Sequence, residues 1–282
     1  SDEGYLELKS LLNKKKCKKI NDEILKTKNI NKEIFFENKK EYLKNKNKEF
    51  KPKNILDNFN LDFILKNKKF VSKIESILGK DYYLYASRVI CAVPHKALPD
   101  WISSKMDKGQ PNLTDFIKHE FRDMRYFHGI DYHMDLVDFS KEKSNFLTVY
   151  IYLDKVTKKM SPLNILPKTH LGGAAPYPHN LIKKKNQIIY KVNSKKEIIS
   201  KNKVLVGSSG DSWFWHGCLL HGTNFNVQGD KPRLSIRLIL RQKNTLMDEL
   251  NFKIGNTVAL TKMKKVIGYH YKNKNISKNL IK

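Results

Sequence analysis

Two short stretches of this sequence contain residues that could bind one metal ion. His133 and Asp135 stand at i and i+2, so on a β-strand both side chains point to the same face. Far downstream, His221 offers a second imidazole, and His216 is the alternative third ligand. Two imidazoles and one carboxylate form the facial ligand set of non-haem iron(II), which leaves three coordination positions open. Zinc accepts the same ligands, so the residue types alone do not identify the metal.

A basic residue that could hold an anionic co-substrate follows His221. Arg233 lies at the start of a strand-like segment, and a guanidinium binds a carboxylate through two N–H groups. Ser235, at i+2, shares this face and can donate its hydroxyl to the same carboxylate. Arg237 and Arg241 continue along the face, where their burial would be costly without anionic partners. The alternative is that this face of the strand is exposed to solvent.

The segments around these residues have the patterns of short β-strands. In residues 146–153, aromatic and hydroxyl side chains alternate with aliphatic ones, which predicts a strand buried on both faces. Further strands are predicted at residues 82–93, 188–192, 204–206, 211–215 and 234–240. Many short strands after an N-terminal helical part favour a barrel or a sandwich flanked by helices.

The N-terminal third has the apolar spacing of helices. Leu6, Leu8, Leu11 and Leu12, and then residues 20–25, predict surface-lying helices. Residues 70–78 predict a helix packed on one face, with Gly79 as its C-terminal cap. Residues 94–128 contain Pro and Gly punctuation around a short helix predicted near residues 116–121. We expect this excursion from the sheet to form a lid over a pocket.

Composition bounds the class of protein without naming its partner. The 282 residues carry 55 Lys plus Arg against 28 Asp plus Glu, a net charge of +27. Such a charge attracts nucleic acid or other anions, but scattered Lys among Asn and Ile also arises from a biased genome composition. Three cysteines without CxxC pairing indicate neither a disulfide framework nor a zinc ribbon. No stretch is apolar enough for a membrane span, so we expect a cytoplasmic protein.

Several of these stretches together resemble one enzyme family. The matching text includes the His133 and Asp135 pair, the strand after it, Leu166-Pro167-Lys168-Thr169-His170, and His221-Gly222-Thr223-Asn224 followed by Pro232-Arg233. Residues from about 55 to 242 are similar to the phytanoyl-CoA dioxygenase family of iron(II)- and 2-oxoglutarate-dependent oxygenases. The resemblance implies a mainly β protein with flanking helices, a double-stranded β-helix of the jelly-roll or cupin-like barrel type. We expect residues 1–54 to form a helical decoration and residues 243–282 a C-terminal extension packed on the core.

The resemblance also assigns roles to individual residues. His133, Asp135 and His221 would bind Fe(II), and Arg233 with Ser235 would hold 2-oxoglutarate. O2 would be the second co-substrate, with ascorbate as reductant. Thr148 and Tyr150 would line the co-substrate site, although core packing is an equal alternative for them. His170 falls in a loop motif of the family and is expected to be a structural hydrogen-bond partner.

By the same resemblance, the reaction would be hydroxylation of an unactivated carbon in a small molecule. An aspartate at position 135 favours hydroxylation over halogenation, while desaturation and ring closure stay open. Substrate residues are expected in the lid-like segment, where the candidates are Trp101, Lys105, Arg122, Arg125, Tyr126 and His128. Their basic members suggest an anionic metabolite or natural-product intermediate, unless they are solvated surface. A nucleic-acid demethylase of this fold and a non-catalytic cupin-like binding protein are the competing hypotheses, and the oligomeric state is left open.

Overall fold

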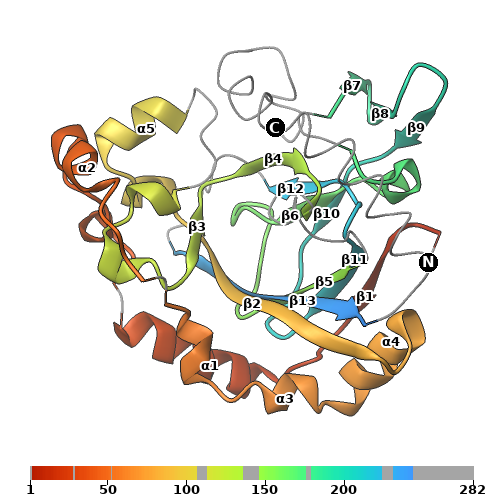
Figure 1. The fold of residues 1–282 in the computed structure, drawn as a ribbon, viewed down its shortest axis with the longest axis horizontal. Coiled ribbons are helices and arrows are strands. Elements are labelled where there is room, and N and C mark those ends of the chain that lie inside the picture. The colour runs from red at the N-terminus through yellow and green to blue at the C-terminus, as the bar shows by residue number, and fades with distance from the viewer. Residues whose placement is uncertain are drawn as a thin grey trace.

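Two β-sheets dominate the computed structural model, which describes residues 2–27, 29–51, 53–106, 113–135, 146–175, 179–223 and 231–243. The larger sheet has six strands in the order β1 (Tyr5–Leu8), β11 (Ser212–His216), β5 (Phe146–Tyr152), β13 (Arg233–Gln242), β2 (Tyr82–Ala92) and β3 (Arg125–Phe127). The smaller sheet has the order β10 (Lys203–Leu205), β6 (Leu163–Ile165), β12 (His221–Thr223) and β4 (Ile130–His133). A three-stranded sheet of β7 (Leu181–Lys184), β8 (Gln187–Lys191) and β9 (Glu197–Ser200) lies beside them (Figure 1).

The inner face of the six-stranded sheet packs against the four-stranded sheet. A buried cluster joins Tyr152 and Trp213 of the large sheet to Leu163, Ile165 and Leu205 of the small one. The Tyr152 hydroxyl donates a hydrogen bond to the carbonyl oxygen of Leu205 at 2.8 Å, which ties the two sheets together. The predicted mainly β, jelly-roll class is confirmed. Within the described residues its two main sheets are separate and do not close into one continuous barrel.

The outer face of the six-stranded sheet is covered by helices. The helices of the described residues are α1 (Lys14–Thr27), α2 (Lys39–Asn45), α3 (Asp62–Leu65), α4 (Lys68–Leu78) and α5 (Asp100–Met106), with 3₁₀ turns at Lys32–Ile34, Ile55–Asn58, His95–Ala97, Thr114–Phe116, His119–Phe121 and Thr169–Gly172. Figure 1 shows α1, α3 and α4 along one side of the sheet. Ile20 of α1 and Ile74 of α4 are buried in one cluster with Val149 and Ile236 of the sheet. Burying this aliphatic face stabilises the central strands from the side away from the other sheet.

The strand and helix predictions hold for most of the chain. The strand pattern of residues 146–153 becomes β5, which is buried along its whole length. The predicted helix before Gly79 is α4, and Gly79 ends it with a φ of +74°, which glycine adopts readily. The short helix expected near residues 116–121 is instead a pair of 3₁₀ turns. No helix among the described residues is both long and apolar enough to cross a membrane.

One N-terminal prediction is wrong. The spacing of Leu6, Leu8 and Leu11 suggested a helix, but residues Tyr5–Leu8 form strand β1 at the edge of the six-stranded sheet. β1 pairs antiparallel with β11, so that Leu6 lies opposite Phe214. The partner strand supplies backbone hydrogen bonds that a four-residue helix could not provide by itself, and this tertiary pairing overrides the local pattern.

Candidate metal centre

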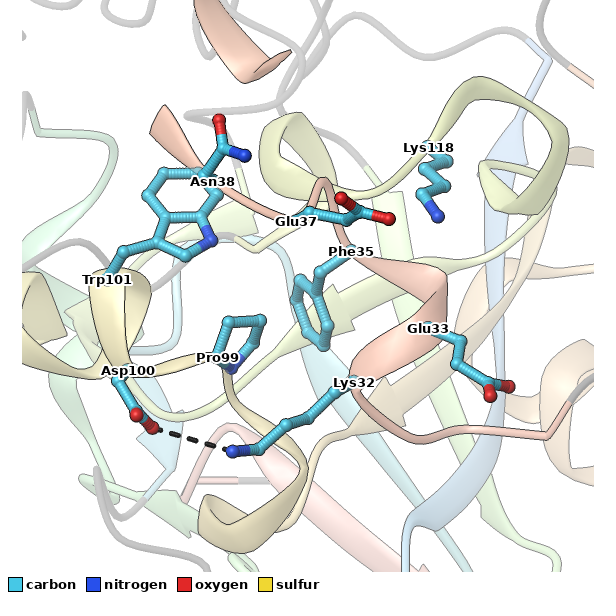
Figure 2. A pocket seen from close by; sticks show the side chains of 9 residues that line it. All are labelled: Lys32, Glu33, Phe35, Glu37, Asn38, Pro99, Asp100, Trp101 and Lys118. Atoms are coloured by element: carbon cyan, nitrogen blue, oxygen red, sulfur yellow. Dashed lines mark hydrogen bonds and ion pairs between the residues drawn. The ribbon is translucent and has the colours of Figure 1, made fainter. Parts of the chain in front are cut away.

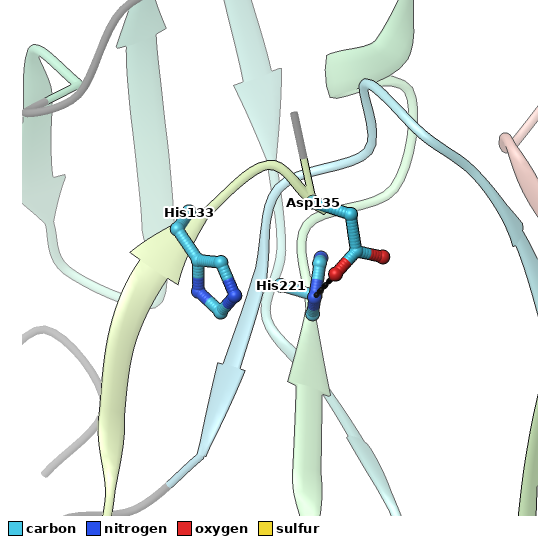
Figure 3. A group of neighbouring side chains, drawn as sticks. All are labelled: His133, Asp135 and His221. Carbon is cyan, nitrogen blue, oxygen red and sulfur yellow. Dashed lines mark ion pairs between the residues drawn. The ribbon is translucent and has the colours of Figure 1, made fainter. Parts of the chain in front are cut away.

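The three predicted ligands come together at one end of the four-stranded sheet. His133 ends β4, Asp135 follows two residues later, and His221 begins β12. β12 pairs antiparallel with β4, and His221 lies directly opposite His133 in the register. One ligand atom from each of the three residues lies within 4.8 Å of the others. Figure 3 shows the side chains turned toward a common point.

Both imidazoles are held in the tautomer that a metal ligand needs. The Nδ1 atom of His133 is 2.9 Å from the carbonyl oxygen of Asp131, and that of His221 is 3.0 Å from the carbonyl oxygen of Leu219. A carbonyl oxygen only accepts hydrogen bonds, so each Nδ1 carries the proton. In each ring Nε2, rather than Nδ1, is therefore the nitrogen that would bind a metal ion, the usual arrangement around metal-binding histidines.

Asp135 is a buried carboxylate surrounded by donors. Its Oδ2 accepts hydrogen bonds from the Thr148 hydroxyl and, at 3.2 Å, from the Trp215 indole N–H. Its Oδ1 lies 3.4 Å from Nη1 of Arg237 and 3.5 Å from Nε2 of His221. Burial raises the pKa of Asp135, but the nearby His221, Arg237 and His133 outweigh burial and hold this pKa below its usual value. The carboxylate is thus ionised and fixed in orientation.

This donor set fits a divalent metal ion. Two imidazoles and one buried carboxylate supply two nitrogens and one hard oxygen around a common point. His216, the alternative ligand, lies elsewhere: its ring is 5.6 Å from that of His170, and its Nδ1 accepts the N–H of Cys218 at 3.1 Å. Within the described residues, the single metal-compatible group is the one that contains His221.

A buried arginine lies on the inner face of the neighbouring sheet. Arg233, the first residue of β13, is 1% exposed, and its Nη1 donates to the Ser235 hydroxyl at 3.1 Å. Its guanidinium lies 5.8 Å from the ring centre of Tyr150 and 5.6 Å from that of Tyr152. Within the described residues no acidic side chain pairs with Arg233, and its Nε–H has no hydrogen-bond partner. A buried cation without a counter-ion favours a site for an anionic ligand.

The structure brings some of the predicted co-substrate residues together. Arg233, Ser235 and Tyr150 share the inner face of β13 and β5, where Ser235 lies opposite Tyr152 and Arg237 opposite Tyr150. The hydroxyl of Thr148 instead donates to Asp135. Thr148 thus holds a metal ligand, and its contact with a co-substrate stays a prediction.

Three of the six predicted substrate residues, Arg122, Tyr126 and His128, make contacts inside the protein. Arg122 donates to the carbonyl oxygens of Ile117 and Asp115 and lies over the ring of Phe50. Tyr126 is fully buried in the core beneath the helices. His128 is buried between the carbonyl oxygen of Val93 and the ring of His95. These contacts give each of the three residues a structural role, and their contact with a substrate stays a prediction.

Trp101 lies in a separate surface pocket. Its indole N–H donates to the carbonyl oxygen of Phe36 at 3.1 Å. Figure 2 shows the pocket, which Trp101 lines together with Pro99 and the ion pair between Lys32 and Asp100. The side chain of Lys105 is outside the described part of the chain. Among the five whose side chains the structure describes, Arg125 is the exposed one, and it lies on β3 of the large sheet.

Sequence reasoning missed three side chains near the candidate metal centre. The indole N–H of Trp215 donates to Asp135. His179 is buried, and burial, with smaller contributions from the nearby His133 and His221, lowers its pKa to about 3. Arg88 lies opposite Arg237 on the inner sheet face. Nothing local marks His179 or Arg88, because their positions depend on chain segments far apart in the sequence.

Comparison with known proteins agrees with this geometry. The family model described as phytanoyl-CoA dioxygenase (PhyH) matches residues 1–235. No curated protein sequence matches the chain. The crystal structure of the non-haem α-ketoglutarate-dependent epimerase SnoN from nogalamycin biosynthesis is similar with a TM-score of 0.50 and 13% identity, covering 86% of this chain and 78% of SnoN. The likeness to SnoN is one of fold.

Two further solved structures are similar at slightly lower scores. EvdO2 from Micromonospora carbonacea var. aurantiaca has a TM-score of 0.49 and 13% identity, covering 89% of this chain and 91% of its own. The apo form of EctD from S. alaskensis has a TM-score of 0.49 and 11% identity, covering 86% of this chain and 74% of its own.

Proposed function

Because the chain belongs to the phytanoyl-CoA dioxygenase family of non-haem iron, 2-oxoglutarate-dependent oxygenases, we propose that it hydroxylates an unactivated carbon of a small molecule. The net reaction converts the substrate C–H, 2-oxoglutarate and O2 into an alcohol, succinate and CO2. Iron and 2-oxoglutarate, when bound, activate O2 for removal of hydrogen from the substrate carbon and insertion of oxygen. Desaturation and ring closure are the alternatives within the same chemistry.

The observation that carries this proposal is the pairing of the ligand group with a buried arginine. His133, Asp135 and His221 would hold the iron, and their ligand atoms already lie within 4.8 Å of one another. Arg233, which lacks an acidic partner within the described residues, would bind the distal carboxylate of 2-oxoglutarate through its guanidinium fork. A plain metal-binding protein would need the ligand group but not a buried arginine without a counter-ion.

The surrounding side chains would orient the ligands and keep water out. Thr148 and Trp215 fix Oδ2 of Asp135, which leaves Oδ1 on the side of His221. Ser235 supports the guanidinium of Arg233, and Tyr150 and Tyr152 provide buried aromatic walls beside it. A dry, fixed environment strengthens electrostatic contacts to a dicarboxylate.

The first test measures co-substrate binding to the full chain. We expect Mn(II) with 2-oxoglutarate to raise the melting temperature of the wild type, because a ligand that binds the folded state stabilises it. The additional rise from 2-oxoglutarate should vanish in Arg233→Ala and persist in the matched control Arg241→Ala. Arg241 is also buried on β13, but its guanidinium stacks over Tyr85. Equal stabilisation of both variants would contradict the assignment of Arg233.

The second test measures turnover. Succinate release with Fe(II), ascorbate and a panel of amino acids, fatty acyl conjugates and alkylated oligonucleotides should rise with members of one small-molecule class. Mass spectrometry of the product should show the gain of one oxygen atom. Turnover with the alkylated oligonucleotides alone would replace this proposal with nucleic-acid demethylation.

A further inference from the structure

Arginine is used selectively in this chain. The sequence contains 49 lysines but six arginines. Five of the six lie on strands of the large sheet. Their sequence neighbours belong to the outer face, which packs against the helices, so the arginines are on the inner face: Arg88, Arg125, Arg233, Arg237 and Arg241. A compositional preference for lysine does not explain this placement. Arginine differs from lysine in presenting a planar fork that binds carboxylate or phosphate through two hydrogen bonds.

Three of these arginines are neighbours across adjacent strands. Arg237 of β13 lies directly opposite Arg88 of β2 in the antiparallel register. Arg125 of β3 lies opposite Ile90, so it is diagonal to Arg88 on the same face. Opposite and diagonal positions on one sheet face are within reach of long side chains. We call Arg88, Arg125 and Arg237 the arginine track.

The arginine track runs from solvent to the candidate metal centre. Arg125 is exposed at the edge strand, Arg88 is half-buried, and the side chain of Arg237 is 14% exposed. Nη1 of Arg237 lies 3.4 Å from Oδ1 of Asp135, the carboxylate that the proposed function assigns to the metal. A molecule bound along the track would therefore have one end beside the metal and the other near solvent.

The positive charges of the arginine track repel one another. Burial and the charges of Arg125 and Arg237 lower the pKa of Arg88. Asp57 and Asp123 raise this pKa, but they offset the lowering only in part. The guanidinium of Arg88 donates to the carbonyl oxygen of Lys53 at 3.2 Å, a neutral partner. Within the described residues, neither Arg88 nor Arg125 forms an ion pair with a carboxylate. Like charges gathered at a partly buried site are stabilised by an anion that bridges them.

We propose that the arginine track binds an oxyanion of the substrate, a carboxylate or a phosphate, and so presents the adjoining carbon skeleton to the metal centre. This inference rests on the proposed function, because it places the substrate next to Asp135. It narrows the substrate class to small molecules with an anionic group at one end. The track differs from the Arg233 site, because Arg233 lies four residues before Arg237 on β13, beside Tyr152 and Ser235.

The test uses the full chain loaded with Mn(II) and saturating 2-oxoglutarate, which occupies the Arg233 site. The probes are inorganic phosphate and carboxyl-labelled acetate, each at constant ionic strength. Mn(II) is paramagnetic and speeds the nuclear relaxation of atoms bound close to it, so the phosphorus and carbon relaxation rates report an oxyanion held near the metal. We expect saturable enhancement for at least one probe. Phosphate alone would indicate a phosphorylated substrate, and acetate alone a carboxylic acid.

Variants assign the enhancement to the track. Arg125→Gln and Arg88→Gln should each weaken binding of the probe about tenfold, equal to about 1.4 kcal/mol. Lys69→Gln, which removes one positive charge from the exposed face of α4, should leave the binding unchanged. Arg125 is exposed, so its replacement should leave the fold intact, and Arg125→Lys tests whether the fork itself matters.

The outcomes separate this inference from the proposed function. Mn(II) and 2-oxoglutarate binding without enhanced relaxation of either probe would overturn the arginine track and leave the proposed function standing. If the relaxation of the probe is enhanced equally in the wild type, Arg125→Gln and Arg88→Gln, the arginine track is likewise overturned and the proposed function stands. Failure of the wild type to bind Mn(II) and 2-oxoglutarate would overturn both.

Discussion

The hydroxyl of Thr148 offers a direct test of how the protein holds its metal-binding carboxylate. The hydroxyl donates to Oδ2 of Asp135, and both residues are fully buried. Thr148→Val replaces the hydroxyl with a methyl group of similar size, so the change removes one hydrogen bond without opening a cavity. Trp215 and Arg237 remain as partners of the carboxylate.

The expected effect follows from the strength of the lost bond. A hydrogen bond to a charged group contributes about 1.5–3 kcal/mol. Loss of a group that orients a metal ligand weakens metal binding about 10- to 100-fold. In free energy this factor is close to the contribution of the lost hydrogen bond. We therefore expect Thr148→Val to weaken Mn(II) binding by this factor, and Thr148→Ser, which keeps the hydroxyl, to restore most of it.

The assay is calorimetric titration of Mn(II) into the wild type and both variants, first without and then with 2-oxoglutarate. An unchanged Mn(II) affinity of Thr148→Val without 2-oxoglutarate would refute the argument that Thr148 fixes the carboxylate. If the affinity for 2-oxoglutarate fell while that for Mn(II) did not, Thr148 would line the co-substrate site instead.

Two further predictions concern stability. Gly210 has a φ of +87°, and a Cβ added there would lie 1.9 Å from the carbonyl oxygen of Leu12. Gly173 has a similar φ of +71°, but a Cβ added there would meet no atom within 4 Å. Gly210→Ala should therefore lose more stability in urea unfolding than Gly173→Ala. Backbone strain alone costs about 1–3 kcal/mol, and equal losses would show that the contact with Leu12 does not matter. Burial and the charge of His170 lower the pKa of His216 to about 4 from 6.5, so the unfolded chain takes up a proton that the folded protein does not. Stability should therefore fall by about 3 kcal/mol as the pH drops from 6.5 to 4, and His216→Asn should remove this part of the fall in urea melts across that range.

The sequence predicted those parts of the site that are set by local period. The alternation of residues 146–153 fixes which side chains share a face of β5, whatever the rest of the chain does. The sequence also predicted that His133 and Asp135 converge, although Asp135 lies two residues past the end of β4. The spacing of Arg233 and Ser235 likewise places both on one face of β13. These features survive folding because a strand has a fixed side-chain period.

The features that the sequence did not predict depend on which strands become neighbours. β1 forms a strand because β11 offers an edge, and Arg88 joins the arginine track because β2 pairs with β13. The N–H of Trp215 reaches Asp135 across eighty positions of sequence. Registers of this kind are decided by packing between distant segments, which a local pattern does not encode.

The most direct test of the central claim is anomalous diffraction at the iron edge from crystals grown without oxygen in the presence of Fe(II) and 2-oxoglutarate. The account predicts one peak bounded by Nε2 of His133, Nε2 of His221 and the carboxylate of Asp135, with the distal carboxylate of 2-oxoglutarate on Arg233. A peak beside His170 and His216, or 2-oxoglutarate bound away from Arg233, would contradict it.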